Sequence, residues 1–162
     1  MGRFILSAFA DEIADDLRTQ MDVLDEHGIK YIEMRGVNGK NITSHSLDEV
    51  REIKRQLDAR GFKISAVGSP LGKIKITDDF AAHLELFKHT LKIAQILETR
   101  YIRIFSFYLP EQEEPSKYRN DVMKRLEEFI AEAEGTGITL LHENEKDIYG
   151  DIPERCLDLF KT

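Results

Sequence analysis

The sequence predicts an α/β fold with a parallel sheet, built from five consecutive β-strand/α-helix units. Apolar, β-branched runs alternate along the chain with segments of helical periodicity. A glycine also recurs at the junction between a helix and the strand that follows it. The order strand, loop, helix, glycine describes a βαβ series, in which right-handed crossovers place successive strands parallel to one another.

The expected strands are runs rich in β-branched and aromatic residues. The chain contains five of them, at residues 4–10, 30–36, 62–68, 100–107 and 138–143. Between these runs, apolar residues recur three or four positions apart, as in a helix that covers one face of a sheet. The four stripes are Leu17, Met21 and Leu24; Leu47, Val50, Ile53 and Leu57; Phe80, Leu84, Phe87 and Leu91; and Val122, Leu126, Phe129, Ile130 and Ala133.

Capping signals mark the ends of these helices. Ser46 and Glu49 have the spacing of a capping box, and Asp151 and Glu154 repeat it with Pro153 in the first turn. Glycines that follow a helix and precede a strand are expected to adopt the left-handed conformation of a helix C-cap. They are Gly28, Gly61 and Gly137.

The spacing of the strands predicts a barrel. The strands begin at about residues 4, 30, 62, 100 and 138, so a unit averages roughly 33 residues. Eight such units amount to roughly 270 residues, a usual size for a (β/α)8 barrel. We therefore expect residues 1–162 to form the N-terminal five of eight units, as one incomplete domain that stops within a fifth amphipathic helix.

Composition favours a small-molecule partner. The formal net charge of −7, with no basic stripe, disfavours nucleic acid and anionic membranes. No apolar run is long enough for a transmembrane span, and no signal peptide is recognisable. Cys156 is the single cysteine, which excludes an internal disulfide and agrees with a reducing cytoplasm.

Charged residues alternate with apolar ones along the predicted strands. If the isoleucines pack on the helices, then Glu33, Arg35, Arg103 and Glu143 face the barrel interior, and Val67 faces it too. Two interpretations remain open, a structural ion-pair network and an active site at the carboxyl ends of the strands. Two interpretations also remain open for Asp11 and Glu12, just past the first strand: they are acidic residues at the start of a helix, or they contact the substrate.

Three segments carry a family resemblance. Residues 32–36 (Ile-Glu-Met-Arg-Gly), 65–70 (Ser-Ala-Val-Gly-Ser-Pro) and 142–145 (His-Glu-Asn-Glu) resemble, in order and spacing, the sugar phosphate isomerase/epimerase family of xylose-isomerase-like TIM barrels. The resemblance implies that Glu143 is a metal ligand and the acid/base catalyst of proton transfer through an enediolate. It implies a divalent metal, Mn²⁺, Mg²⁺, Co²⁺ or Zn²⁺, in the complete protein, and a sugar or sugar phosphate as substrate.

The other metal ligands of that family lie on later strands, so we expect this chain alone to bind no metal firmly and to be inactive. Residues expected at the substrate are Glu33, Arg35, Ser69, Arg103 and Phe107. His142 is expected to face the helical layer and His83 to be solvated or half-buried.

Two other functions remain open. The first is a non-catalytic five-stranded α/β binding or folding module, and the second is the nuclease branch of the superfamily, which the acidic charge disfavours. We also expect association with a second copy through open barrel edges, driven in part by exposed Phe105, Leu141 and Val67.

Overall fold

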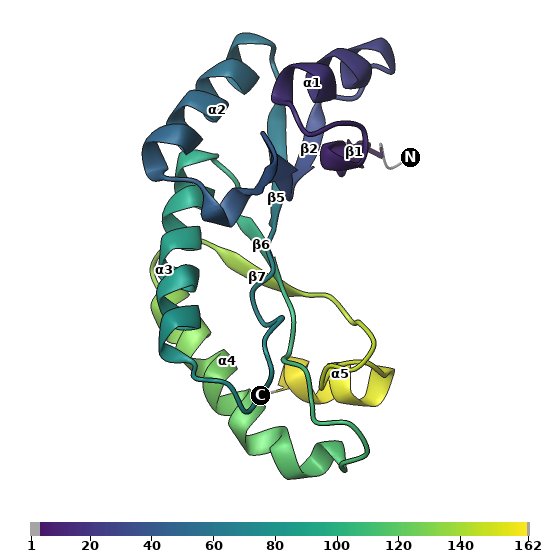
Figure 1. Cartoon of the computed structure of the whole chain (residues 1–162), viewed down its shortest axis with the longest axis vertical. Coiled ribbons are helices and arrows are strands. Elements are labelled where there is room, and N and C mark those ends of the chain that lie inside the picture. The colour runs from purple at the N-terminus through teal and green to yellow at the C-terminus, as the bar shows by residue number, and fades with distance from the viewer. Residues whose placement is uncertain (1–3, 162) are drawn as a thin grey trace.

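The computed structural model describes residues 4–161. Its main sheet has five strands in the order β1-β2-β5-β6-β7, and all neighbouring strands are parallel. The strands are β1 (Ser7–Ala8), β2 (Tyr31–Met34), β5 (Lys63–Gly68), β6 (Tyr101–Ile104) and β7 (Thr139–His142). The predicted parallel α/β fold is confirmed, and the described strands form an open arc (Figure 1).

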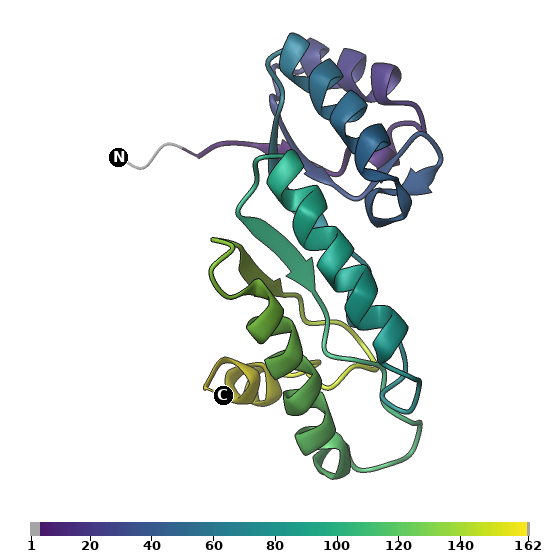
Figure 2. The same ribbon diagram turned by 90° about the vertical axis from the view of Figure 1, so that its left-hand side faces the viewer.

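Five α-helices alternate with these strands: α1 (Leu17–Glu26), α2 (Leu47–Ala59), α3 (Ala81–Ile96), α4 (Arg119–Ala133) and α5 (Pro153–Lys161). Three short 3₁₀ helices lie in the connections: η1 (Ala10–Glu12), η2 (Ile42–Ser44) and η3 (Pro115–Tyr118). Helices α2, α3 and α4 lie along one face of the sheet, as Figure 2 shows. The capping box of Ser46 and Glu49 is present, and Gly28, Gly61 and Gly137 have positive φ, so these boundary predictions are confirmed.

The core lies between the sheet and the helices. Ile32, Met34, Ile102 and Ile104 are buried there, which confirms that the isoleucine face of the strands packs on the helical layer. Glu33 and Arg103 lie on the opposite, inner face of the arc and are only partly buried. Among the described residues, no helix is long and apolar enough to cross a membrane.

The face predicted for Val67 is wrong because β5 contains a bulge. Ile32 pairs with Ile64 but Glu33 pairs with Ala66, so Ser65 has no partner residue on β2. One extra residue reverses the alternation of the side chains beyond it. Val67 therefore turns toward the helices and is fully buried.

A short hairpin follows β2 and was not predicted. Strands β3 (Gly36–Val37) and β4 (Lys40–Asn41) are antiparallel, and Asn38 and Gly39 connect them. Both connecting residues have positive φ, 52° and 73°, as in a type I′ turn. The Asn-Gly pair was a recognisable hairpin signal in the sequence.

Candidate functional site

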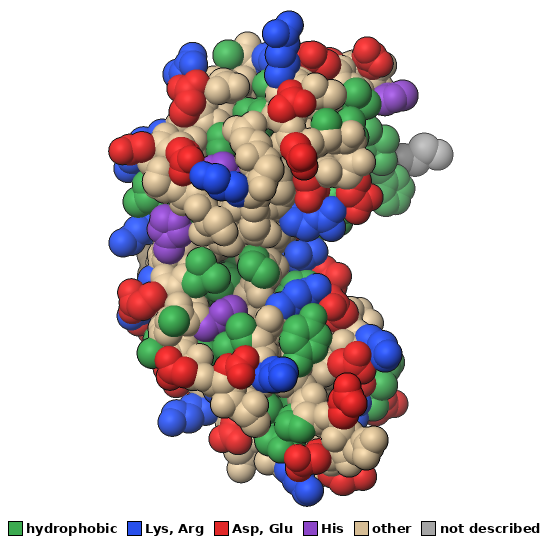
Figure 3. Space-filling model, viewed as in Figure 1, with side chains coloured by type: hydrophobic (Ala, Val, Ile, Leu, Met, Phe, Trp, Pro, Cys, Tyr) green, Lys and Arg blue, Asp and Glu red, His purple; other side chains and the backbone are tan. Residues whose placement is uncertain are grey.

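Polar side chains converge at the carboxyl ends of the parallel strands, on the inner face of the arc. Glu33 lies on β2, Arg35 directly follows it, Arg103 lies on β6 and Glu143 directly follows β7. Because the carboxyl ends of parallel strands meet at one edge of the sheet, these four predicted residues share one surface. Figure 3 shows acidic and basic side chains together on this inner side.

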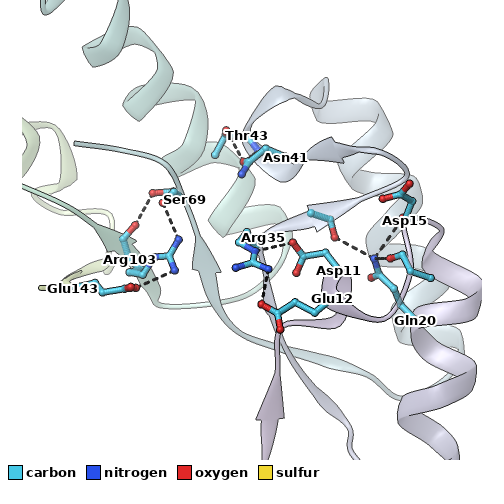
Figure 4. A network of polar contacts seen from close by, with 12 residues as sticks. Asp11, Glu12, Asp15, Gln20, Arg35, Asn41, Thr43, Ser69, Arg103 and Glu143 are labelled. Atoms are coloured by element: carbon cyan, nitrogen blue, oxygen red, sulfur yellow. Dashed lines mark hydrogen bonds and ion pairs between the residues drawn. The ribbon is translucent and has the colours of Figure 1, made fainter. Parts of the chain in front are cut away.

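Arg103 is the most constrained member of this surface. Its Nη1 lies 3.0 Å from Oε2 of Glu143, and its Nη2 donates to the carbonyl oxygen of Ser69 over 3.2 Å (Figure 4). The guanidinium also lies 4.9 Å from the ring centre of Phe105. Its side chain is only 13% exposed, and its buried Nε–H has no hydrogen-bond partner among the described residues. Arg103 therefore holds the Glu143 carboxylate in a defined orientation.

Arg35 belongs to a second ion-pair group beside the first. Its Nε donates to Asp11 over 2.7 Å and its Nη2 donates to Glu12 over 3.0 Å, both from η1. The hydrogen bond that Arg35 donates to Asp11, with burial opposing it, raises the pKa of Arg35. A Cβ on Gly36 would lie 2.9 Å from Oδ2 of Asp11, so a side chain at position 36 would force the Asp11 carboxylate to move.

Glu33, on β2, interacts electrostatically with members of both groups but has a different environment. Burial raises the pKa of its carboxyl; Arg103 opposes this effect and the negative charge of Glu143 adds to it. A carboxylate close to a basic group and a carboxyl with a raised pKa thus share one surface. Such a pair is suited to taking up and returning a proton.

A third ion pair was not predicted from the sequence. Nζ of Lys73 lies 2.6 Å from Oε2 of Glu145 and 4.2 Å from the ring centre of Phe105, while the Tyr108 hydroxyl donates to Oε1 of Glu145 over 3.3 Å. Lys73 and Glu145 belong to loops of different βα units, so no local pattern linked them. Both acidic residues of the Glu143-Asn144-Glu145 segment thus form ion pairs, Glu143 with Arg103 and Glu145 with Lys73.

Comparison with known proteins decides the family. The family profile described as a xylose isomerase-like TIM barrel matches residues 21–161. The chain belongs to this family. No curated protein matches the sequence.

Several solved structures share the fold at low sequence identity. A D-tagatose 3-epimerase-like protein is 20% identical with a TM-score of 0.70, over 96% of this chain and 59% of that one. The probable 3-DHS dehydratase AsbF of Bacillus anthracis is 16% identical with a TM-score of 0.76, over 99% and 58%. A barrel protein of Mycobacterium smegmatis in complex with magnesium is 16% identical with a TM-score of 0.72, over 97% and 60%. The chain thus spans about three fifths of the length of these structures.

The described residues do not by themselves form the metal centre that this family resemblance implies. No group of three or more His, Cys, Asp or Glu side chains within residues 4–161 is placed to hold a metal ion. Glu143 already faces the guanidinium of Arg103, and its side chain is 43% exposed. It could contribute one oxygen ligand, whereas a catalytic metal needs about three from the protein.

Two predicted substrate residues need correction. Phe107 is fully buried among Phe80, His83 and Phe129 in the helical layer, because its positive φ of 66° turns the ring away from the inner face. Ser69 is also fully buried; its hydroxyl donates to the carbonyl oxygen of Arg103. Ser69 therefore supports Arg103 and offers no surface to a substrate.

Of the two histidine predictions, one is confirmed and one is wrong. His142 faces the helical layer, as predicted. His83 is buried, contrary to the prediction, because its Nε2 accepts a hydrogen bond from the Gly72 backbone N–H over 2.8 Å.

Proposed function

We propose that this chain is part of a sugar or sugar-phosphate isomerase or epimerase in which Glu143 transfers the proton. The observation that carries the proposal is the pairing of Glu143 with Arg103 at the carboxyl end of β7, beside Glu33. It is supported by membership of the xylose isomerase-like TIM barrel family, whose solved relatives include an epimerase-like protein.

The proposed step is proton abstraction from the carbon next to a carbonyl group. The Glu143 carboxylate takes the proton, and the electron pair of the C–H bond forms the enediolate. Return of the proton to the neighbouring carbon, with transfer of the hydroxyl proton from one oxygen to the other, gives isomerisation, and return to the opposite face of the same carbon gives epimerisation. Arg103 orients the base, and Glu33, whose pKa is raised by burial, is the candidate for a second proton-carrying group.

We further propose that Glu143 is one ligand of a divalent cation, Mn²⁺, Mg²⁺, Co²⁺ or Zn²⁺, whose other ligands lie outside this sequence. When bound, such a cation stabilises negative charge on the substrate oxygens. Magnesium in one solved relative supports a divalent metal in the family. We also propose a cytoplasmic location, because a single cysteine agrees with a reducing compartment.

One observation favours a second function. The lack of a three-ligand metal group among residues 4–161 agrees with a non-catalytic α/β binding or folding module. A module of this kind needs the sheet and its helices but not Glu143.

Exchange of substrate protons with solvent separates the two functions. The longest polypeptide that contains this sequence is incubated in D₂O with ketoses, ketose phosphates or hydroxypyruvate and each metal, and NMR follows deuterium at the carbon next to the carbonyl. We expect exchange that Glu143→Gln lowers by at least about 10²-fold, since general acid–base catalysis contributes this much. Glu127→Gln, on the helical side of the sheet, is the matched control and should not change the rate. Absence of exchange with every substrate and metal would favour the module.

A further inference from the structure

A polar cluster of buried Ser106 and Gly150 with partly buried His142 lies behind the candidate site, on the helical side of the sheet. Nε2 of His142, the last residue of β7, lies 3.0 Å from Oγ of Ser106, which follows β6. The backbone N–H of Gly150 donates to the same Oγ over 2.7 Å. Ser106 is fully buried, so this hydroxyl is shared between one side chain and one backbone group, with no access to solvent.

The direction of these hydrogen bonds follows from the donor groups. The Gly150 N–H can only donate, so Oγ of Ser106 is the acceptor and the hydroxyl proton is free to donate to Nε2 of His142. When the hydroxyl donates in this way, Nε2 is the unprotonated nitrogen of a neutral imidazole, and the ring proton is on Nδ1.

Close packing leaves room only for glycine at position 150. A Cβ at this position would lie 2.4 Å from Cε1 of His142 and 2.7 Å from Cδ1 of Leu159. Contacts this short do not occur between real atoms, so any side chain would displace the imidazole or helix α5. Gly150 and the ring of His142 therefore fit one another in a single arrangement.

This cluster closes the loop that carries Glu143. At one end, the backbone N–H of Glu143 donates to the carbonyl oxygen of Ile104 over 3.0 Å. At the other end, Gly150 is held by Ser106, two residues beyond Ile104. Tyr149 adds a backbone hydrogen bond to Phe107 over 3.2 Å. The two ends of the 143–150 loop are thus fixed to residues 104–107, at the last residue of β6 and just beyond it, and this stretch directly follows Arg103.

We propose that Ser106, His142 and Gly150 form a clamp that positions Glu143 against Arg103 for proton transfer. The three residues touch neither substrate nor reacting atoms, so they are positioning residues. The inference rests on the proposed function of Glu143 for its catalytic consequence, but its structural part does not.

The clamp is tested first on the unaltered chain. The ¹⁵N NMR shifts of His142 should show a neutral ring with the proton on Nδ1, and the Gly150 amide should exchange with solvent more slowly than the exposed amide of Asn144. A proton on Nε2 in the neutral ring, or a Gly150 amide that exchanges as fast as that of Asn144, would overturn the clamp. This measurement needs no substrate and no metal.

Ser106→Ala then removes the shared hydroxyl. We expect exchange of the Gly150 amide to quicken by at least about tenfold, with faster exchange of the Arg103 guanidinium protons as the Glu143 pair loosens. The matched control is Thr90→Ala, since Thr90 is also fully buried and loses one hydrogen bond, to Leu86, but lies far from the loop in the middle of α3. An equal effect of both variants on the 143–150 loop would mean general destabilisation and would overturn the proposal.

The catalytic arm uses the polypeptide that shows proton exchange. In that polypeptide, Ser106→Ala should lower kcat by at least about tenfold with KM little changed, because a misplaced base slows proton transfer more than it weakens substrate binding. An unchanged kcat together with a loosened loop would overturn the positioning role. If no polypeptide shows exchange, the proposed function fails, while the tautomer and amide measurements still decide whether the clamp exists.

Discussion

Arg103 and Glu143 meet across two neighbouring strands, with Nη1 and Oε2 3.0 Å apart at the edge of the sheet where barrel enzymes carry their chemistry. The register of β6 and β7 creates this pair, since Arg103 pairs with Leu141 and Glu143 follows two residues later. The arginine is almost buried, at 13% exposure, and the glutamate is 43% exposed. The basic partner is therefore the fixed one, and the acid reaches the surface where a substrate would bind.

This asymmetry predicts a small coupling energy. In a double-mutant cycle with Arg103→Met and Glu143→Gln, we expect a coupling of about 0.5–1 kcal/mol in the free energy of unfolding, because a half-exposed ion pair is well screened. The single Arg103→Met change should cost more than Glu143→Gln, since it also removes the hydrogen bond to the Ser69 carbonyl. Urea denaturation of the four proteins measures this. A coupling above about 3 kcal/mol would show a pair shielded from solvent.

The 162-residue chain alone should neither turn over ketoses nor bind Mn²⁺ or Zn²⁺ saturably. Its described residues place no three His, Cys, Asp or Glu side chains around one point. Calorimetric titration with each metal, and the D₂O exchange assay with the purified chain, measure the two expectations. Turnover by the chain with Mn²⁺ would mean that the ligands assemble in a way residues 4–161 do not show.

Gly72 should tolerate no side chain. Its φ is +84°, and a Cβ would lie 2.0 Å from the carbonyl oxygen of Phe105, a backbone atom that cannot rotate away. We expect Gly72→Ala to cost about 3 kcal/mol or more, combining left-handed strain with this clash. Gly28→Ala is the matched control, because φ is +66° there but the space is open, so strain alone should cost about 1–2 kcal/mol. Equal losses in thermal unfolding would contradict the clash.

The sequence was sufficient for the layers of the fold because helical and strand periodicity are local properties. Ile32 and Ile102 were assigned to the helical face correctly for this reason. Val67 was not, because the bulge at Ser65 arises from pairing between β2 and β5, which no single strand encodes. Phe107 was misplaced because its side-chain direction depends on a positive φ that a bulky residue rarely adopts.

In the candidate site too, residues on strands could be predicted and residues on loops could not. Glu143 and Arg103 were predicted to share a face because strand alternation and parallel order suffice to place them. The Lys73–Glu145 pair was not predicted, since its members lie on loops whose conformations depend on each other.

Open sheet edges should cause the chain to self-associate. Among the described strands, β1 and β7 each pair on one side only, so they present unpaired N–H and C=O groups. Phe105 and Val67, expected to be exposed, are fully buried, whereas Leu141 on β7 is 40% exposed. We therefore expect sedimentation at low micromolar concentration to detect oligomers that Leu141→Lys reduces. Ile13→Lys, at a similarly exposed residue of 39%, is the control. A compact monomer would contradict this expectation.

His83 should make the fold sensitive to acid. Burial, with a further contribution from Arg125, lowers the pKa of His83 to about 4 from its usual 6.5. The unfolded chain therefore binds this proton more readily than the folded chain. The stabilisation from His83 is complete above pH 6.5 and is lost as the pH falls from 6.5 to about 4. A shift of this size corresponds to about 3 kcal/mol at most.

The test compares the free energy of unfolding at several pH values between neutrality and pH 4. His83→Gln keeps an acceptor for the Gly72 N–H but does not titrate, so its stability should fall less over this interval than that of the unaltered chain. His27→Gln, at the exposed C-cap of α1, is the matched control for the same exchange outside the core. If His83→Gln and the unaltered chain lose stability in parallel, carboxylates and not His83 determine the acid sensitivity, because their ion pairs also weaken as the pH falls.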